Sequence, residues 1–354
     1  MLFVQGEGRG HLTQAIAVFH MLKRLNYEIP KVAVGIPRNR QVPQYAKDLF
    51  GDALVTYHTL EIIYKHGRKV DKLGTIFRNV IRAPGYIRSR RIIRKYVRQH
   101  RPAYILNFFE PLAALAVVDL SYPTHRISVS HQNLFMFSPE FPLEGHFIDA
   151  FVTRFLTQLA NVRTDHMMVL SLYPIDAPSK RFTICPPLLR EEIYKLQTTQ
   201  DEDVLVYLLN QEYLNEIEKL AERHPQLQFV CFCDHKHADA IYRALTNLTI
   251  CKLDGSRFIE HMRHSKYVVT TSGFETVAEA IYMGKRVVAI PVQNHYEQNC
   301  NGSDLQRSGL GFMRENYDFQ LDTMAFPDNA QLTGPTRTWF DRKEEIFFRV
   351  FDNP

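Results

Sequence analysis

Short runs of β-branched and aromatic residues alternate with longer amphipathic segments along the whole chain of 354 residues. This alternation predicts parallel sheets covered by helices, because a parallel crossover needs a connection of helix length. Strand candidates in the first half are residues 2–5, 31–36, 53–57, 103–107, 126–129, 167–172 and 181–185. In the second half they are 204–209, 228–233, 249–253, 267–271 and 286–291, with helical patterns at 212–223, 238–245, 274–283 and 296–307. We therefore expect an α/β protein with two doubly wound parallel sheets.

A change in sequence character separates the two series of strands. Two prolines follow Cys185, and the polar stretch 197–203 has no hydrophobic periodicity. Since proline interrupts a regular backbone ladder, we place a domain boundary near residue 190. A single core usually stops growing at about 250–300 residues, which also favours two domains. The predicted parts are 1–190, 191–333 and a terminal segment 334–354 that contains a helix over 339–351.

Composition restricts the class of protein and its partners. Lysine plus arginine number 43 against 38 aspartates and glutamates, an excess too small over this length to predict nucleic-acid binding. The five cysteines are widely spread, so neither a disulfide framework nor a metal site is predicted. A signal-peptide pattern and an apolar run of about 20 residues are both lacking. We expect a cytoplasmic protein, with a peripheral position on the inner face of the membrane as a further option.

A glycine-rich turn follows the first predicted strand. Gly6, Gly8 and Gly10 precede His11, and a helical pattern begins at residue 12. Glycines let a backbone approach its ligand closely, and the free N–H groups of a helix start favour an anion. His11 would stand at the carboxyl end of a strand and could accept a proton from an acceptor hydroxyl. A purely structural turn, with His11 as a helix cap, is the alternative.

The second half repeats the order of strand, glycine turn and helix. The amides of Gly273, Phe274 and Glu275 would point at an anion. The hydroxyls of Ser272 and Thr276 could add hydrogen bonds to it. This turn is therefore a candidate phosphate site.

Polar side chains continue beyond this turn. Glu279 lies one helical turn after Glu275, where a carboxylate could bind two hydroxyls of a ribose. Glu297 and Gln298 follow the next strand, and such donors and acceptors suit the hydroxyls of a sugar. Singly, each could be a capping or solvated residue. Together, at one edge of one sheet, they favour a sugar-nucleotide site.

These motifs resemble those of the GT-B superfamily of glycosyltransferases. The stretch from Gly6 to His11 is similar to the first glycine loop of the branch that contains the bacterial peptidoglycan-precursor N-acetylglucosaminyltransferase, and the stretch from Ser272 to Glu279 resembles its donor motif. The resemblance covers nearly the whole chain, although its clear motifs are few. It implies two Rossmann-like domains facing a cleft, the first for acceptor and the second for donor. It also implies a last helix that returns to the first domain.

The resemblance further implies roles for individual residues. The diphosphate would lie at Ser272, Gly273 and Thr276, the ribose at Glu279, and the donor sugar at Glu297 and Gln298. His11 would stand at the reaction centre. Such enzymes invert the anomeric carbon in a single displacement and have no tightly bound cofactor or metal. The implied donor is a nucleotide-diphosphate sugar, with UDP as the expected nucleotide.

Two other loops of the first half contain candidate residues. Glu110 follows one predicted strand and could orient His11. His131 follows another and could touch the acceptor. A loop-packing role for Glu110 and His131 is the alternative.

A basic segment begins at Arg78 and ends at Arg101, with nine lysines and arginines and no acidic residue. Apolar residues are interleaved with the charges, so a helix here could bind an anionic membrane surface and would suit a lipid-linked acceptor. An ordinary helix with a solvated charged face is the alternative.

The sequence thus predicts a hexosyltransferase that passes a sugar from a nucleotide-diphosphate donor to an unidentified acceptor, lipid-linked or another glycan. Two alternatives share the same residues. One is a nucleotide-sugar epimerase of the same fold, and the other is a non-catalytic protein that binds sugar nucleotides or membrane surfaces.

Overall fold

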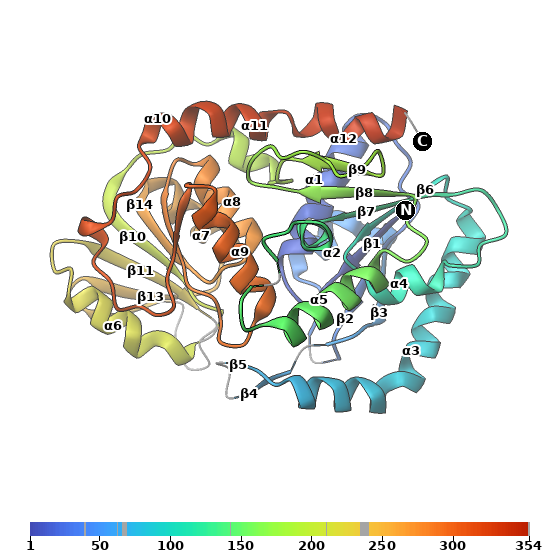
Figure 1. The fold of residues 1–354 in the computed structure, drawn as a ribbon, viewed down its shortest axis with the longest axis horizontal. Helices are drawn as coiled ribbons and strands as arrows, with labels where there is room; N and C mark the ends of the chain where they lie inside the picture. Colours follow the sequence, from blue (N-terminus) through green and yellow to red (C-terminus); the bar gives the residue numbers. More distant parts are fainter. Residues whose placement is uncertain are drawn as a thin grey trace. The chain divides into compact units, whose positions relative to one another are not determined.

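The computed structural model describes residues 1–38, 40–61, 63–65, 69–141, 143–209, 211–233 and 241–352. This part of the chain forms two compact units (Figure 1). Unit 1 comprises Met1–Ile63, Asp71–Glu191 and Asp341–Pro354, and unit 2 comprises Tyr64–Val70 and Glu192–Phe340. Each unit is built on a seven-stranded sheet, which confirms the predicted α/β fold with two Rossmann-like sheets.

The sheet of unit 1 is parallel throughout, in the order β3-β2-β1-β6-β7-β8-β9. Its strands are β1 (Leu2–Gln5), β2 (Val32–Ile36), β3 (Leu54–His58), β6 (Tyr104–Phe108), β7 (His125–Ser130), β8 (His166–Leu170) and β9 (Phe182–Cys185). The strand order reverses between β1 and β6. In an open parallel sheet, such a reversal leaves a crevice at the carboxyl ends of the two strands, where ligands bind.

Helices of unit 1 cover both faces of this sheet. They are α1 (Gly10–Arg24), α2 (Gln44–Phe50), α3 (Lys72–His100), α4 (Pro111–Ala116), α5 (Phe147–Ala160) and α12 (Lys343–Asp352). Phe3 of β1 packs with Val97 of α3 and Ala113 of α4 in one fully buried cluster. Because side chains alternate along a strand, the buried Leu2 and Val4 face the other side, where α1 contacts β1.

The last helix belongs to unit 1. Phe347 of α12 is fully buried, and the ring of Phe348 lies 6.2 Å from the ring of Tyr27, which follows α1. Helix α12 also packs on β9. The predicted return of the C-terminal helix to the first domain is therefore confirmed.

Unit 2 has the strand order β12-β13-β11-β10-β14-β15-β16, which is parallel except for the edge strand β12. Its strands are β10 (Asp201–Tyr207), β11 (Gln228–Cys233), β12 (Ile241–Leu245), β13 (Leu248–Lys252), β14 (Ser265–Thr270), β15 (Arg286–Ala289) and β16 (Gly311–Met313). Its helices are α6 (Leu214–Glu222), α7 (Gly255–His264), α8 (Phe274–Tyr282), α9 (Tyr296–Arg307), α10 (Asn329–Gln331) and α11 (Arg337–Asp341). The order reverses between β10 and β14, and in such sheets ligands bind at the carboxyl ends of the strands at this point. A two-stranded hairpin, β4 (Tyr64–Lys65) with β5 (Lys69–Val70), completes the strands.

The predicted helix over 238–245 is wrong for residues 241–245, and residues 238–240 lie outside the described part. Residues 241–245 form β12, which pairs antiparallel with β13 and sets Tyr242 opposite Ile250. This pairing supplies backbone partners and cross-strand contacts that outweigh a short local helical pattern. Strand β16 was not predicted, because its three residues are too few to show a periodic pattern.

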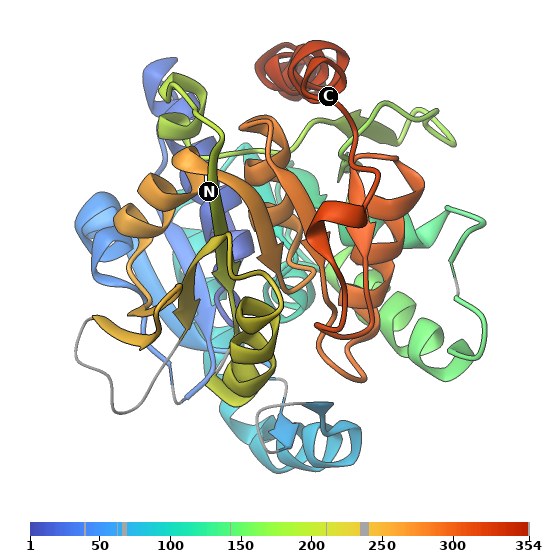
Figure 2. The ribbon, with the colours of Figure 1, turned by 90° about the vertical axis from the view of Figure 1, so that its left-hand side faces the viewer.

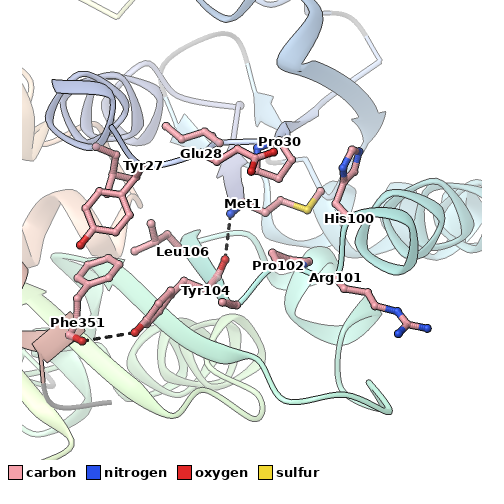
Figure 3. A pocket seen from close by; sticks show the side chains of 13 residues that line it. Met1, Tyr27, Glu28, Pro30, His100, Arg101, Pro102, Tyr104, Leu106 and Phe351 are labelled. Atoms are coloured by element: carbon pink, nitrogen blue, oxygen red, sulfur yellow. Dashed lines mark hydrogen bonds between the residues drawn. The ribbon is translucent and has the colours of Figure 1, made fainter. Parts of the chain in front are cut away.

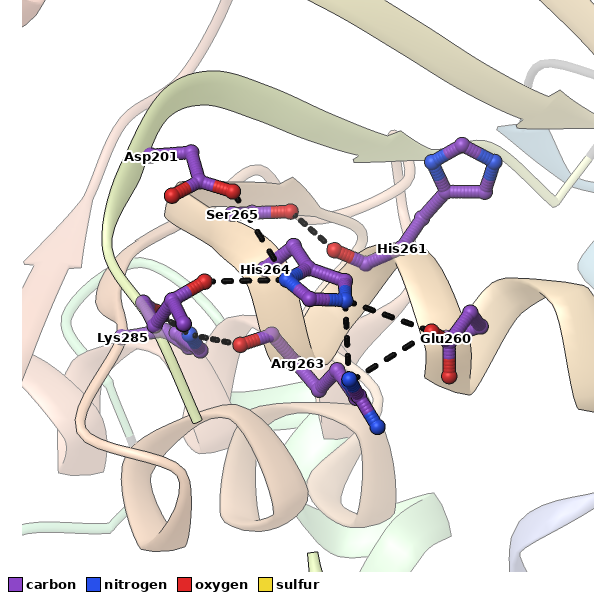
Figure 4. A network of polar contacts seen from close by, with 8 residues as sticks. Asp201, Glu260, His261, Arg263, His264, Ser265 and Lys285 are labelled. Carbon is purple, nitrogen blue, oxygen red and sulfur yellow. Dashed lines mark hydrogen bonds and ion pairs between the residues drawn. The ribbon is translucent and has the colours of Figure 1, made fainter. Parts of the chain in front are cut away.

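A buried lysine of unit 2 forms hydrogen bonds with the segment before β10 (Figure 4). Lys285 is fully buried, and its ammonium group donates to the carbonyls of Thr199 (2.5 Å) and Arg263 (2.7 Å). Burial lowers the pKa of Lys285 to about 8. The ring of His264 bonds the Thr199 hydroxyl and the Glu260 carboxylate at 2.9 and 3.2 Å. This network lies at the starting ends of the strands, away from the glycine turn that follows β14.

Candidate functional site

The turn between β1 and α1 is pressed against β2. The Gly6 N–H donates to the Gly35 carbonyl at 2.7 Å, and a Cβ added to Gly6 would lie 2.7 Å from the same oxygen. A Cβ added to Gly8, by contrast, would meet nothing within 4 Å. Helix α1 begins at Gly10 and lacks a side-chain cap, so its first N–H groups keep their capacity for an anion. His11 stands in its first turn.

These two glycines give a matched stability test. We expect Gly6→Ala to lower the free energy of unfolding by about 2 kcal/mol, because the strand backbone must move to admit the methyl group. Gly8→Ala should change it by less than about 0.5 kcal/mol. Urea denaturation measures both. Equal destabilisation by the two substitutions would contradict the packing described for Gly6.

His11 is held by three neighbours from unit 1. Its ring stacks on Phe109, with the centroids 5.4 Å apart and 21° between the planes. Its Nδ1 lies 3.4 Å from Gln14 Oε1, and its Nε2 lies 3.4 Å from Gln132 Nε2. Burial lowers the pKa of His11 to about 4, and the bond with Gln14 opposes this only in part. The imidazole is therefore neutral near pH 7 and able to accept a proton.

Phe109 reaches His11 through an unusual backbone conformation. It follows β6 at the reversal of strand order and has φ 53°, in the left-handed region that non-glycine residues avoid at a cost of about 1 kcal/mol or more. Strain of this kind concentrates at functional sites. The carboxyl ends of β1 and β6 thus bring His11 and Phe109 together where the strand order reverses.

The carboxylate of Glu110 forms hydrogen bonds with Thr59 and Leu112 and not with His11, which it was expected to orient. Its Oε1 accepts hydrogen bonds from the Thr59 hydroxyl (2.7 Å) and the Leu112 N–H (3.1 Å), which caps α4. No hydrogen bond or ion pair joins Glu110 to His11 among the described residues, so the geometry gives no support for an orienting role. Glu110 is fully buried, and burial raises its pKa to about 8 against the lowering effect of these bonds.

The raised pKa of Glu110 predicts a pH-dependent stability. The folded state keeps this proton up to about pH 8, whereas the unfolded chain loses it near its ordinary pKa of 4.5, so the wild type loses stability as pH rises between these values. Glu110→Gln should remove this loss, about 2 kcal/mol between pH 5 and pH 6.5. Urea denaturation at the two pH values measures it, with the exposed Glu144→Gln as control. The same pH slope in Glu110→Gln and wild type would contradict the assignment.

His131 lies inside unit 1 rather than on an acceptor surface. It is 2% exposed, and its Nδ1 bonds the Leu170 carbonyl at 2.7 Å. This position favours the packing alternative. Its neighbour Gln132 is the residue of this loop that reaches His11. No sequence pattern marks Gln132, Gln14 or Phe109 as site residues, because their contacts with His11 form only when side chains from separate elements meet.

In unit 2 a glycine turn joins β14 to α8. Gly273 is the N-cap residue of α8 and supplies no side-chain cap. Ser272 is fully buried, and its hydroxyl has no hydrogen-bond partner among the described residues. Thr276 is half-buried on the first turn. An unsatisfied buried hydroxyl beside a helix start fits an anionic ligand such as a phosphate.

Two carboxylates of α8 are enclosed beside this turn. Glu275 is 7% exposed and Glu279 is 2% exposed. Carboxylate oxygens accept hydrogen bonds, so two of them beside the glycine turn suit the recognition of hydroxyl groups. Phe274 is 9% exposed and packs in the same turn.

The segment after β15 is organised around the same turn. The side chain of Asn301 donates to the Ser272 carbonyl at 2.9 Å and so joins α9 to the glycine turn. Gln298 is 8% exposed, and its Oε1 accepts from the Val292 N–H at 2.8 Å. His295 caps α9 by accepting from the Gln298 N–H at 3.4 Å. Glu297 is half-buried on the first turn of α9. The predicted donor residues therefore gather at one edge of unit 2.

Unit 1 contains a cavity of about 390 Å³ at the amino-terminal ends of β1 and β6 (Figure 3). Met1, Tyr104 and Phe351 are among its lining residues, and the Met1 amino group donates to the Tyr104 carbonyl at 3.0 Å. Met1 and Tyr104 stand at the starts of β1 and β6. The cavity is therefore separate from His11, which lies beyond the opposite end of β1.

Within the described ranges, no group of three His, Cys, Asp or Glu side chains has an arrangement that could hold a metal ion. No helix within them is long and apolar enough to cross a membrane.

Comparison with known sequences gives a family match over most of the chain. The family described as "Glycosyl transferase family 1" matches residues 1–326. An uncharacterized glycosyltransferase of Methanosarcina acetivorans is 22% identical over 341 residues, which cover 88% of this chain and 84% of that protein. A second, from Methanosarcina mazei, is 20% identical over 351 residues with the same coverage.

Solved structures show the same fold at low sequence identity. The glycotransferase of kitacinnamycin has a TM-score of 0.65 at 17% identity, over 100% of this chain and 98% of that one. Phytolacca americana UGT2, solved with UDP-2-fluoro-glucose and pterostilbene, has a TM-score of 0.66 at 12% identity over 99% of both chains. These matches show the fold, and the family match places the predicted resemblance at the level of glycosyl transferase family 1. The narrower likeness to the peptidoglycan branch stays a prediction.

Proposed function

Because the chain belongs to glycosyl transferase family 1, we propose that it is an inverting glycosyltransferase whose donor is a nucleotide-diphosphate sugar, expected to be a UDP-sugar. Membership of this family makes the chain a nucleotide-sugar-dependent glycosyltransferase. Inversion, the hexosyl group, the nucleotide and a lipid-linked acceptor are our proposals. Likewise, Ser272, Gly273 and Thr276 are proposed to hold the diphosphate.

The observation that carries this proposal is the buried hydroxyl of Ser272, which has no hydrogen-bond partner among the described residues and lies at the glycine turn before α8. N–H groups at a helix start stabilise negative charge, and the leaving nucleoside diphosphate gains negative charge as its bond to the sugar breaks. Glu279 is proposed to bind the ribose hydroxyls, and Glu297 with Gln298 the hydroxyls of the donor sugar. These side chains would then hold the anomeric carbon in place for attack.

The acceptor chemistry is assigned to unit 1. An acceptor hydroxyl gives its proton to neutral His11 while its oxygen forms a bond to the anomeric carbon. The bond between that carbon and the diphosphate oxygen breaks in the same step, and the nucleoside diphosphate leaves with the electron pair. Phe109 and Gln132 act as positioning residues, because they hold the imidazole ring from two sides.

Donor consumption tests the proposal. The purified protein is incubated with UDP-sugars and a panel of acceptor alcohols and lipid-linked glycans, and glycosylated products are identified by mass spectrometry. We expect product formation only with donor and acceptor together. Proton NMR of the donor alone checks for epimerisation, and a change in the donor sugar without acceptor would overturn the transfer assignment in favour of an epimerase.

A further inference from the structure

Helix α3 turns polar side chains toward unit 1 along its first half. Asn79 donates to the Glu61 carbonyl at 2.8 Å and accepts from the Glu61 N–H at 3.2 Å. Arg82 pairs with the Glu61 carboxylate, and the Ile63 N–H donates to the Thr75 hydroxyl at 2.9 Å. These bonds fix the rotation of the helix about its axis, with its polar side inward.

The outward side of the same half is apolar. Six large side chains are more than half exposed: Leu73 (80%), Ile76 (60%), Phe77 (69%), Val80 (67%), Ile81 (60%) and Ile87 (57%). With 3.6 residues in a turn, these positions lie along one face of the helix. A helix of a water-soluble surface shows the opposite arrangement, with its apolar line toward the core.

Beyond Ile87 the same outward line becomes basic. Arg88, Arg91, Lys95 and Arg98 are exposed along it, and α3 contains no acidic residue from end to end. The inward side of this second half is apolar, since Ile93 and Val97 are fully buried. The outward face of one helix therefore joins an apolar half to a cationic half.

Helix α5 exposes a second apolar face. Its outward residues are Phe147 (68%), Ile148 (78%), Phe151 (71%), Val152 (45%) and Phe155 (49%). Its buried residues are the small Ala150, Thr157 and Ala160. Helix α4 packs against both α3 and α5, so the three helices form one layer of unit 1. The first half of α3 and α5 both lie in the lower part of the views in Figures 1 and 2.

We propose that unit 1 docks on an anionic lipid bilayer, with the outward apolar faces of α3 and α5 in the interfacial region and the basic half of α3 against lipid phosphates. Exposed apolar surface on this scale marks an interaction site, because most soluble proteins keep such patches small. A bilayer supplies both chemistries next to each other, acyl chains and a sheet of anionic headgroups. The helices lie on the membrane, since no described helix is suited to cross it.

Vesicle flotation without donor or acceptor tests this proposal separately from the transferase assignment. Wild-type protein is mixed with vesicles of phosphatidylcholine, alone or with added phosphatidylglycerol. We expect tighter binding to the anionic vesicles and weakening by salt, since charge attraction is screened. The substitutions Ile76→Gln, Phe77→Gln and Val80→Gln together should lower binding to anionic vesicles by about tenfold or more. The substitutions Phe147→Gln, Phe151→Gln and Phe155→Gln should act likewise.

Two further variants separate the contributions. Arg88→Glu, Arg91→Glu and Lys95→Glu together should abolish the preference for anionic vesicles. Leu25→Gln with Tyr45→Gln replaces two other exposed apolar residues of unit 1, 49% and 51% exposed, and should bind as the wild type. Circular dichroism and thermal unfolding check that each variant is folded.

Three results would overturn the proposal. The first is wild-type protein that floats with neither kind of vesicle. The second is vesicle binding that the apolar and basic variants leave unchanged. The third is self-association in analytical ultracentrifugation that the apolar variants abolish while vesicle binding is lacking, because a second copy of the chain would then cover these faces.

Discussion

Replacing His11 with alanine is expected to lower kcat by about a thousandfold while the affinity for nucleoside diphosphate stays unchanged, because the general base is lost and the donor site in unit 2 is untouched. His20→Ala on the same helix is the matched control and should keep wild-type kcat. Initial rates with a saturating acceptor measure both. Transfer by His11→Ala at the wild-type rate would remove His11 from the mechanism.

The pH dependence of the wild type gives an independent check on His11. Its pKa of about 4 leaves the imidazole neutral from about pH 5 upward, so kcat/KM should be level there and fall only as pH drops through about 4. A base with the ordinary histidine pKa would instead lose activity below about pH 6.5. The position of the acid limb therefore distinguishes a desolvated imidazole from a solvated one.

Glu279→Gln is expected to weaken donor binding by about a hundredfold, because a neutral amide accepts hydrogen bonds from ribose hydroxyls less strongly than a carboxylate does. Calorimetry with UDP measures the change. Glutamine nearly preserves the size of the side chain, and a thermal unfolding curve shows whether the buried site in α8 keeps its packing.

A comparison of ligands makes this test specific for the ribose. Wild-type protein should prefer UDP to 2′,3′-dideoxy-UDP, and Glu279→Gln should bind the two nearly alike, since the interaction that discriminates between them is gone. Equal discrimination by wild type and variant would place the Glu279 carboxylate away from the ribose.

Most of the long strands were predictable because each is a short run of apolar residues between turns. Val204, Leu205 and Val206, for example, are buried on both faces of the sheet, so the run reads as a strand without further context. The helix prediction for residues 241–245 was wrong because their strand conformation depends on pairing with β13, which no local pattern reveals. Helix α1 begins two residues earlier than the pattern indicated, at Gly10.

The candidate site was predictable in its glycine turns and less so around His11. The glycines were predicted to let the backbone approach a ligand, and the structure shows in addition that Gly6 is packed against Gly35 of β2. The ring of Phe109 meets His11 only through a left-handed backbone, and Gln132 does so from 121 positions along the chain. Glu110 and His131 were plausible by position alone, yet their hydrogen bonds go to Thr59 and to the Leu170 carbonyl.

The basic segment shows what a sequence pattern can and cannot fix. Its charge and its apolar spacing predicted a helix that could meet a membrane with its arginines. Spacing of three and four residues marks an apolar line but does not say whether that line faces the core or the solvent. The bonds of Asn79 with Glu61 decide this for the first half of α3, and they turn Phe77 outward.

The place of α12 in unit 1 has a consequence for biosynthesis. Phe347 fills a buried position in the first unit, yet the ribosome makes it after all of the second sheet. During synthesis the packing of the amino-terminal sheet therefore stays incomplete, with β9 partly uncovered, until α12 emerges from the exit tunnel. A truncation before Lys343 should accordingly trap a chain that chaperones retain, even though the carboxyl-terminal sheet has all of its strands.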